Sequence, residues 1–338
     1  MREDMVVLEA SLATCVGRSI SVRHSPISYL SREIVNSRVW LFIKEIFMSK
    51  TENKTLKSES TESTNESPNS VKDLSELGFD ENLDGILKSL KEPSGLILVT
   101  GLSGSGRTTT LYSMLQELRN DSRKIFTIEE PIHKRIDGIN QTELEGGDGL
   151  HYSAAIENAL KQDTDVIFIG EIRNLETAEM AIKASLSGHL VISSLQTKSA
   201  PDTIARLLNM GVSETNLSQA LTCVINQKLL NRICDRCREV DKKVTPAHLA
   251  KFGFKKEHLK NINAYIGEGC DACDQTGVGG HIAIHEFIKI SEPMRNAIRN
   301  SWPLEDINRV AVENGMRTLR QSGLDRLAQG IVSIYEVL

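Results

Sequence analysis

The chain has 338 residues, a formal net charge of −5 and a hydrophobic content of 40%. This length allows two or three domains and a sizeable core. The acidic balance argues against a nucleic-acid partner, and the aromatic content of 4% is too low for base-stacking platforms. The sequence shows neither an apolar run long enough to span a bilayer nor a secretory signal, so we expect a cytoplasmic location.

The first 70 residues carry no functional motif. Residues 1–48 remain an uncharacterised segment, and translation could start at Met1 or at Met48. Residues 49–70 are mostly Ser, Thr, Asn, Glu and Lys, a composition that buries too little apolar surface to offset its ordering entropy. We therefore expect a disordered linker there. From Leu74 to Leu90, apolar residues recur at helical spacing.

A glycine-rich segment follows the aliphatic run 96–99, which predicts a buried strand. A strand, a glycine-rich turn and the start of a helix together aim several backbone N–H groups at one anion. The spacing is that of the P-loop, and the hydroxyl of Thr108 is in position to bind Mg²⁺. An ordinary Gly/Ser loop is the alternative. The predicted nucleotide-binding residues are Gly101, Leu102, Ser103, Gly104, Ser105, Gly106, Arg107, Thr108 and Thr109.

Arg107 stands where the P-loop motif has lysine. An arginine keeps the positive charge and binds phosphate well, but its guanidinium is a wider, planar fork. We therefore expect nucleotide binding to survive this change more readily than turnover.

Acidic residues end two further predicted strands. Residues 124–128 end in Glu129 and Glu130, which suit water activation or metal positioning, although a solvated acidic turn is the plainer interpretation. Residues 166–169 lead into Gly170 and Glu171, which is the Walker B pattern. We expect this strand to lie beside the P-loop strand and to hold Glu171 near Mg²⁺.

A predicted helix over 174–187 leads to a fourth strand over 190–195, preceded by His189 and followed by Gln196. His189 could sense the γ-phosphate, and a packing role is the alternative. Strands that alternate with helices and carry motifs at their ends predict a mainly parallel α/β core.

Four cysteines form two Cys-x-x-Cys pairs, and together they predict a structural Zn²⁺ site. Thiol–disulfide exchange is the alternative. Cys223 lies in an apolar pattern with helical spacing and is expected in the core. We divide the remaining chain into an ATPase core (71–230), an inserted zinc subdomain (231–280) and a C-terminal helical segment (281–338). The predicted zinc ligands are Cys234, Cys237, Cys270 and Cys273.

From about Val71 to Leu338, the sequence resembles the secretion ATPases of the type II secretion and type IV pilus-assembly class. The segment 127–131 resembles their Asp box, 170–173 matches their Walker B end, and 188–197 resembles their His box. Two Cys-x-x-Cys pairs favour the assembly and export branch over the retraction ATPases. Five positions depart from the family pattern. Arg107, Glu130 and Gln196 replace motif residues, and Glu157 and Lys161 stand where the family favours arginines before Walker B. Nothing in 1–70 resembles the family's usual N-terminal domain.

The resemblance implies a RecA-like P-loop ATPase that forms hexamers, uses ATP and Mg²⁺, and works with platform proteins at the cytoplasmic face of the inner membrane. It implies that Glu129 polarises water, that Glu171 supports Mg²⁺ and that His189 lies near the γ-phosphate. Arg107 would meet charge that develops in the transition state. Because of the departures, a nucleotide-binding regulatory subunit with little or no hydrolysis is the second hypothesis.

Overall fold

The computed structural model describes residues 71–119, 123–144, 149–254 and 262–337. These residues all belong to one compact unit of the chain, Glu66–Leu338. The predicted segment 1–48 and the predicted linker 49–70 lie outside the described residues. Among the described helices, none has both the length and the apolar character needed to cross a membrane.

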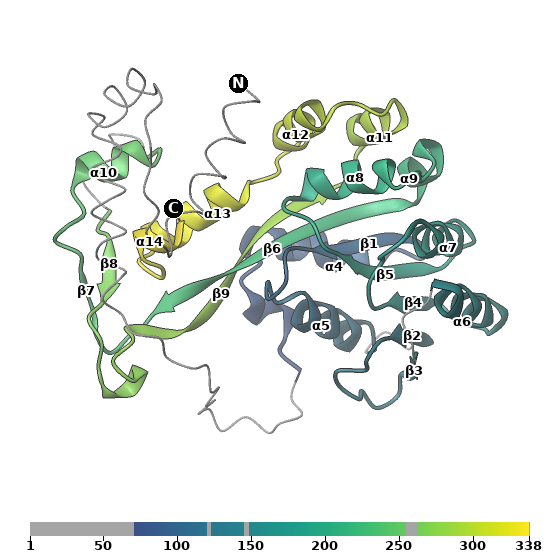
Figure 1. The fold of residues 1–338 in the computed structure, drawn as a ribbon, viewed down its shortest axis with the longest axis horizontal. Helices are drawn as coiled ribbons and strands as arrows, with labels where there is room; N and C mark the ends of the chain where they lie inside the picture. The colour runs from purple at the N-terminus through teal and green to yellow at the C-terminus, as the bar shows by residue number, and fades with distance from the viewer. Residues whose placement is uncertain (1–70, 120–122, 145–148, 255–261, 338) are drawn as a thin grey trace, which may run out of the picture. The chain divides into compact units, whose positions relative to one another are not determined.

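The centre of the described unit is a seven-stranded sheet of order β3-β2-β4-β5-β1-β6-β9 (Figure 1). All neighbouring pairs are parallel except β6 and β9, which are antiparallel. The predicted mainly parallel α/β core is therefore confirmed. The strands are β1 (Gly95–Thr100), β2 (Ile125–Glu129), β3 (Asn140–Glu143), β4 (Val166–Ile169), β5 (Leu190–Leu195), β6 (Leu221–Ile233) and β9 (Val278–Lys289).

Helices cover both faces of the sheet, and alternate side chains of β1 show why. Leu96 and Leu98 join the apolar cluster of one face, whereas Ile97 and Val99 join that of the other. The first face is covered by α6 (Gly149–Lys161), α7 (Leu175–Leu186), α8 (Ala200–Asn209), α9 (Glu214–Ala220), α11 (Glu292–Arg299) and α12 (Leu304–Glu313). The second is covered by η1 (Leu74–Leu77), α4 (Leu83–Leu90) and α5 (Arg107–Arg119), with η2 (Asp80–Asn82) leading into α4.

The order of the strands corrects one expectation. The Walker B strand β4 does not lie directly beside the P-loop strand, because β5 pairs with both β4 and β1 and separates them. All six residues of β5 are buried, which suits a central strand. Local sequence patterns predict that a strand exists but not which strand pairs with it.

Two expectations about secondary structure are also corrected. The stretch from Leu74 to Leu90 is not one helix, because Gly78 ends η1 with a left-handed backbone (φ 76°) and Asp80 has φ 48°. Cys223 is fully buried as expected, but it lies in β6 rather than in a helix. A stretch of continuously apolar residues is compatible with either element.

The strands β6 and β9 extend beyond the sheet as a two-stranded ribbon that ends near the paired cysteines (Figure 1). The expected domain boundaries at 230/231 and 280/281 fall inside these strands, so the subdomain continues the sheet. Residues 281–289 are likewise part of β9 and not of a helix. This end also carries β7 (Arg238–Val240), α10 (Pro246–Lys251), β8 (Tyr265–Gly267) and η3 (Asp271–Cys273), while α13 (Leu319–Ala328) and α14 (Ile334–Val337) pack on the ribbon.

Candidate nucleotide site and metal site

The glycine-rich loop joins the carboxyl end of β1 to the first turn of α5, as predicted. Gly101, Gly104 and Gly106 have φ values of 146°, 74° and 85°, in the region that favours glycine. A Cβ on Gly101 would lie 2.4 Å from the backbone oxygen of Gln227, so only glycine fits there. The first amides of α5 have no partner within the helix and suit an anion. Residues 102–104, 108 and 109 are exposed, whereas Ser105 is buried.

Gln227 of β6 supports this loop from the protein interior, and it belongs to none of the predicted motifs. Its Nε2 donates a hydrogen bond of 2.7 Å to the backbone oxygen of Ser105, and its Oε1 accepts one of 2.9 Å from Thr110. Gln227 is 2% exposed. The sequence feature that could indicate this role is an amide side chain within the apolar stretch of β6, because a buried amide needs hydrogen-bond partners.

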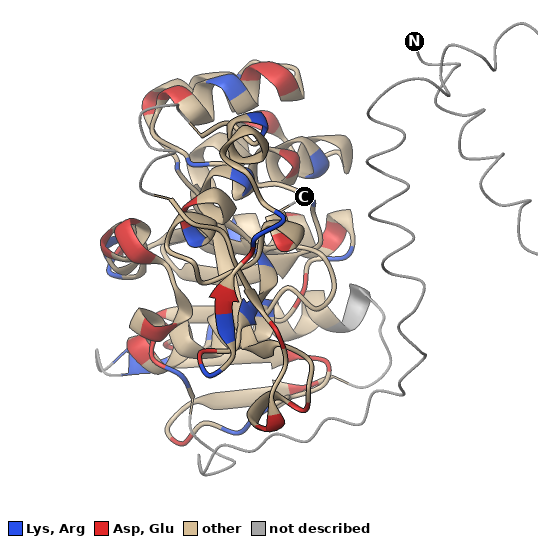
Figure 2. Cartoon of the chain, turned by 90° about the vertical axis from the view of Figure 1, so that its left-hand side faces the viewer, with Lys and Arg blue, Asp and Glu red and all other residues tan. Residues whose placement is uncertain are grey.

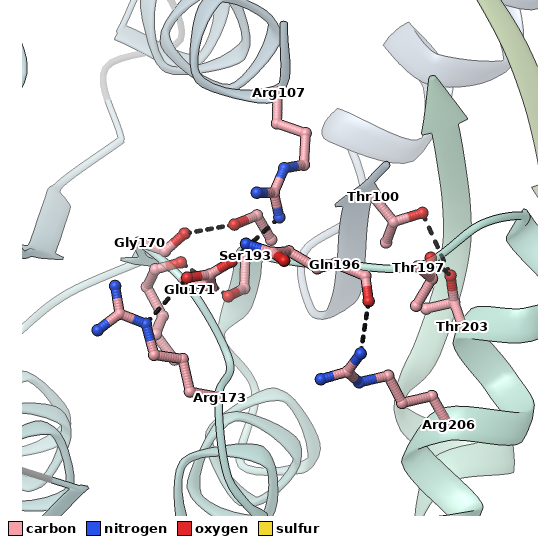
Figure 3. Close-up of polar contacts among 12 residues, drawn as sticks. Thr100, Arg107, Gly170, Glu171, Arg173, Ser193, Gln196, Thr197, Thr203 and Arg206 are labelled. Carbon is pink, nitrogen blue, oxygen red and sulfur yellow. Dashed lines mark hydrogen bonds and ion pairs between the residues drawn. The ribbon is translucent and has the colours of Figure 1, made fainter. Parts of the chain in front are cut away.

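Arg107 points across the carboxyl edge of the sheet to Glu171, which follows β4 (Figure 3). Its Nη1 lies 3.1 Å from Oε1 of Glu171, while Nε of Arg173 lies 2.9 Å from Oε2 of the same carboxylate. Arg173 also contacts Glu130 at 3.3 Å. Burial acts against ionisation of Glu171, but both arginines outweigh it and hold its pKa below the ordinary value. Two opposite charge pairs therefore form one chain of contacts.

Glu129 lines the same pocket as Arg107, Thr108 and Glu171, but it is held by neutral donors. The hydroxyls of Tyr112 and Thr127 donate hydrogen bonds of 2.5 and 2.7 Å to its two oxygens, and Gln141 donates one of 3.1 Å. The residue is only 2% exposed. These donors come from α5, β2 and β3, and none of them is among the predicted site residues.

His189 lies at the edge of the sheet opposite the loop. It precedes β5, whose first residue pairs with Gly95 at the start of β1, and its ring Nδ1 is 3.2 Å from the backbone oxygen of Ala184. Six strand residues separate the two edges by roughly 20 Å. The expectation that His189 lies near a γ-phosphate bound by its own chain is therefore contradicted. Gln196 and Thr197, the last residues of the predicted His box, follow β5 at the carboxyl edge, where Figure 3 shows them on the same side as the Arg107–Glu171 pair.

Hydroxyl and amide groups tie the strand ends together beside the loop. Asn226 Nδ2 donates to Thr100 Oγ1 at 2.9 Å, and Thr203 bonds both Thr100 and Thr197. Ser194 donates to the backbone oxygen of Gly170 at 2.7 Å. These bonds fix the ends of β1, β4, β5 and β6 relative to one another.

The second candidate site is the cluster of four predicted zinc ligands, whose sulfurs all lie within 4.8 Å of one another. The Sγ atoms of Cys234 and Cys270 are 3.9 Å apart, those of Cys237 and Cys273 are 3.8 Å apart, and those of Cys270 and Cys273 are 3.7 Å apart. A tetrahedral Zn²⁺ with Zn–S bonds of about 2.3 Å separates its sulfurs by about 3.8 Å. A disulfide needs about 2.05 Å, so none of these three pairs is a disulfide, and the spacing fits four thiolates around one zinc ion.

Backbone amides support the sulfurs. The N–H groups of Cys270 and Gly277 each lie 3.3 Å from Sγ of Cys273, and that of Gly269 lies 3.3 Å from Sγ of Cys237. Although burial opposes it, the amide bonds from Cys270 and Gly277, with the neighbouring thiols, lower the pKa of Cys273, whereas burial and the same neighbours raise that of Cys237. Thiolate is the form that binds a metal. Figure 2 views the molecule from the side of β7 and β8. On the described residues, Lys and Arg are interspersed with Asp and Glu in this view.

Comparison with known proteins identifies the family. The model of the type II/IV secretion system protein family matches residues 63–338. The chain belongs to the type II/IV secretion system protein family. It is 38% identical over 272 residues to the type IV pilus assembly ATPase PilB of Thermus thermophilus. It is also 38% identical over 274 residues to the type II secretion system ATPase E of Vibrio cholerae. The family that the sequence motifs predicted is confirmed.

The chain spans only part of these relatives. Each match covers 79% of this chain, but 30% of the Thermus protein and 52% of the Vibrio protein. Among solved structures, the pilus retraction motor PilT with bound ADP superposes with a TM-score of 0.60 and 28% identity, over 80% of this chain and 67% of that chain. The ATPase DotB of Legionella pneumophila, at 21% identity and a TM-score of 0.59, supports the fold alone.

Proposed function

We propose that this protein is an ATPase that binds ATP at the loop 101–109, hydrolyses it with Mg²⁺, and drives the assembly of a secretion or pilus structure. The observation that carries this proposal is the P-loop at the end of β1, with Glu171 facing it across the carboxyl edge of the sheet. The curated relatives named above are ATPases of type II secretion and type IV pilus assembly.

Several residues of the site have a proposed part in this reaction. The loop amides and Arg107 would bind the phosphates, and Arg107 would meet the charge that develops on them. Thr108 and Glu171, which line one pocket, would hold Mg²⁺. That ion would neutralise phosphate charge. Glu129 would polarise the attacking water, with Tyr112, Thr127 and Gln141 orienting its carboxylate.

Steady-state hydrolysis of ATP by the zinc-loaded full chain tests this function. We expect turnover that requires Mg²⁺ and falls by about 100-fold or more in Glu171→Gln, because that change removes charge at the reacting centre. Calorimetry with ADP supplies an independent measure of binding. Absence of both adenine nucleotide binding and hydrolysis would refute the proposal.

A second candidate is a nucleotide-binding subunit that regulates an authentic motor and hydrolyses little ATP. Two observations favour it: Arg107 replaces the P-loop lysine and is paired with Glu171, and Gln196 occupies the His-box position at the carboxyl edge. Tight ADP binding with turnover no faster than that of Glu171→Gln would support this candidate. A large gain of rate in Arg107→Lys would show that this position limits hydrolysis.

The remaining proposals concern assembly and location. We propose that the four cysteines hold a structural Zn²⁺ and that the protein forms a hexamer in the cytoplasm, docked on inner-membrane platform proteins. The sulfur spacing supports the metal, and family membership supports the partners. Metal analysis and mass photometry with and without ATP test the first two.

A further inference from the structure

We propose that Arg107 is a latch, held by Glu171 in the nucleotide-free chain and released when nucleotide phosphate competes for its guanidinium. This inference rests on the proposed function, and it adds a regulatory role to a residue of the same site. Arg107 is the first residue of α5, yet it contacts Glu171 just after β4, across the intervening strand β5.

The contact is largely shielded from water. The side chains of Arg107 and Glu171 are 15% and 19% exposed. Salt and water therefore screen this pair much less than a surface pair. Because a guanidinium has several donors in a fixed fork, Arg107 can hold the carboxylate through Nη1 and still present other N–H groups to the loop.

Glu171 cannot easily serve a metal in this state. Each of its two oxygens already receives an arginine, Oε1 from Arg107 and Oε2 from Arg173. A divalent cation placed at this carboxylate would meet two positive charges within a few ångströms, and like charges at that range repel strongly in a poorly screened site. At least one arginine must move before Glu171 can bind Mg²⁺.

Nucleotide supplies the reason for Arg107 to move. Arg173 is also paired with Glu130, so it stays anchored, whereas the only carboxylate in an ion pair with Arg107 among the described residues is Glu171. A phosphate at the loop offers the guanidinium a ligand with more charge and matching bidentate geometry. Once Arg107 turns to the phosphate, Glu171 loses one of its two cations and becomes available. The carboxylate of Glu171 thus becomes free to bind Mg²⁺ only when nucleotide is present.

The affinity for ADP tests the latch, measured by calorimetry on the zinc-loaded full chain with magnesium omitted and no chelator added. Glu171→Gln should tighten ADP binding about tenfold, the effect of weakening one charge-assisted hydrogen bond. Glu130→Gln is the matched control, because it removes one negative charge from the same pocket without contacting Arg107. We expect it to change ADP affinity by less than about threefold.

A cycle with Arg107→Gln separates the latch from simple loss of repulsion between Glu171 and phosphate. In the Arg107→Gln background, Glu171→Gln should tighten ADP binding no more than Glu130→Gln does. Equal tightening by Glu171→Gln and Glu130→Gln in the Arg107 background would overturn the latch. So would a tenfold gain that persists in the Arg107→Gln background.

A second measurement does not need nucleotide binding. Phenylglyoxal modifies accessible arginines, and peptide mapping reports its reaction at Arg107. Glu171→Gln should raise the rate of modification several-fold, and Glu130→Gln should leave it unchanged; equal rates in wild type and Glu171→Gln would overturn the latch. Failure of the proposed function gives a different result from failure of the latch. If the proposed function is wrong, neither the wild type nor any variant binds ADP, while the modification rates still report on the ion pair.

Discussion

Two regions of the molecule differ in how their charged groups are balanced. We call the carboxyl edge of the sheet around the loop 101–109 the nucleotide edge, and the end that carries the four predicted zinc ligands the tetracysteine end. At the tetracysteine end, four groups of one kind gather with three pairs of sulfurs 3.7–3.9 Å apart, and backbone amides donate hydrogen bonds to two of them, Cys237 and Cys273. At the nucleotide edge, Arg107, Glu171, Arg173 and Glu130 already neutralise one another. A cluster of thiolates is incomplete without a cation and points to a resident metal. A set of side chains whose charges neutralise one another is stable without a ligand, and it favours a ligand that binds reversibly.

The largest expected effect tests the proposed zinc site. Replacing Cys270 by serine removes one of the four sulfurs, so we expect bound zinc to fall from about one per chain to a small fraction of that. Because structural zinc contributes directly to folding, we expect the ribbon end to lose about 5 kcal/mol or more of stability. Metal analysis and thermal unfolding measure these changes.

The same variant tests whether the two regions are independent. Cys270 follows β8, whereas the loop follows β1, and the two are joined mainly through β6. We expect ADP affinity to change by less than about threefold in Cys270→Ser at a temperature where the chain stays folded. Loss of ADP binding would show that Gln227 transmits disorder from the ribbon to the loop, and the comparison of separate regions would fail.

The second prediction concerns the backbone of the nucleotide edge. Gly101→Ala places a methyl group 2.4 Å from the backbone oxygen of Gln227 at a φ of 146°, so we expect a loss of about 3 kcal/mol in the free energy of unfolding. Gly104→Ala is the control, since its φ is 74° but nothing lies within 4 Å of the added carbon. It should cost about 1 kcal/mol. Urea unfolding compares them, and equal losses would mean that the loop is not shaped before ligand binds.

Local patterns in the sequence account for part of both regions. The loop glycines, the acids at strand ends and the two Cys-x-x-Cys pairs are short-range features. The structure places the loop and the acids around one pocket and gathers the four cysteines into one cluster. The position of β5 between β4 and β1 depends on long-range pairing, which periodicity does not encode. The contact of Gln227 with the loop also depends on long-range pairing, because β6 is far from the loop in the sequence. The expected position of His189 near the γ-phosphate was wrong, because a residue that precedes a parallel strand lies at the amino edge of the sheet, away from the loop.

The third prediction uses a residue on β9, the strand that leads from one region to the other. His285 is 2% exposed and packs against Phe79, with ring centroids 4.1 Å apart. Burial, with the charge of Arg326, lowers its pKa to about 3, whereas an unfolded histidine titrates near 6.5. The unfolded chain therefore binds the extra proton first as pH falls. Stability from neutral His285 is complete above pH ~6.5 and is lost toward pH ~3.

The measurement compares wild type with His285→Phe, which keeps a ring against Phe79 and removes the titration. We expect wild type to lose about 2 kcal/mol more than the variant between pH 7 and pH 5. Urea unfolding at several pH values gives both slopes. Monitoring the tetracysteine end by metal release and the nucleotide edge by ADP binding shows whether acid weakens both regions together. Parallel slopes in the two proteins would exclude His285 as the titrating group.

The smallest effect concerns the one acid of the nucleotide edge that has no arginine partner among the described residues. Glu129 is held by hydroxyl and amide donors, and the pKa of its partner Tyr112 is raised by burial and by Glu129 itself. Tyr112→Phe removes one donor to Glu129 and the acceptor of the His133 and Lys134 amides. We expect a loss of about 1–2 kcal/mol in stability. Tyr152→Phe, in the same pocket but without a bond to Glu129, should cost less.

Turnover separates two roles for this buried carboxylate. If Glu129 polarises water, Tyr112→Phe lowers the rate of ATP hydrolysis, since the carboxylate loses its orientation, while ADP affinity stays within about threefold of wild type. If Glu129 serves only to fix β2 against α5, both variants follow their losses of stability and turnover of folded protein is unchanged. The first outcome would make this edge a site with two kinds of acid, one restrained by arginine and one oriented by neutral donors. Charge balance alone would then not describe the nucleotide edge, because Glu129 would be positioned for chemistry before any ligand arrives.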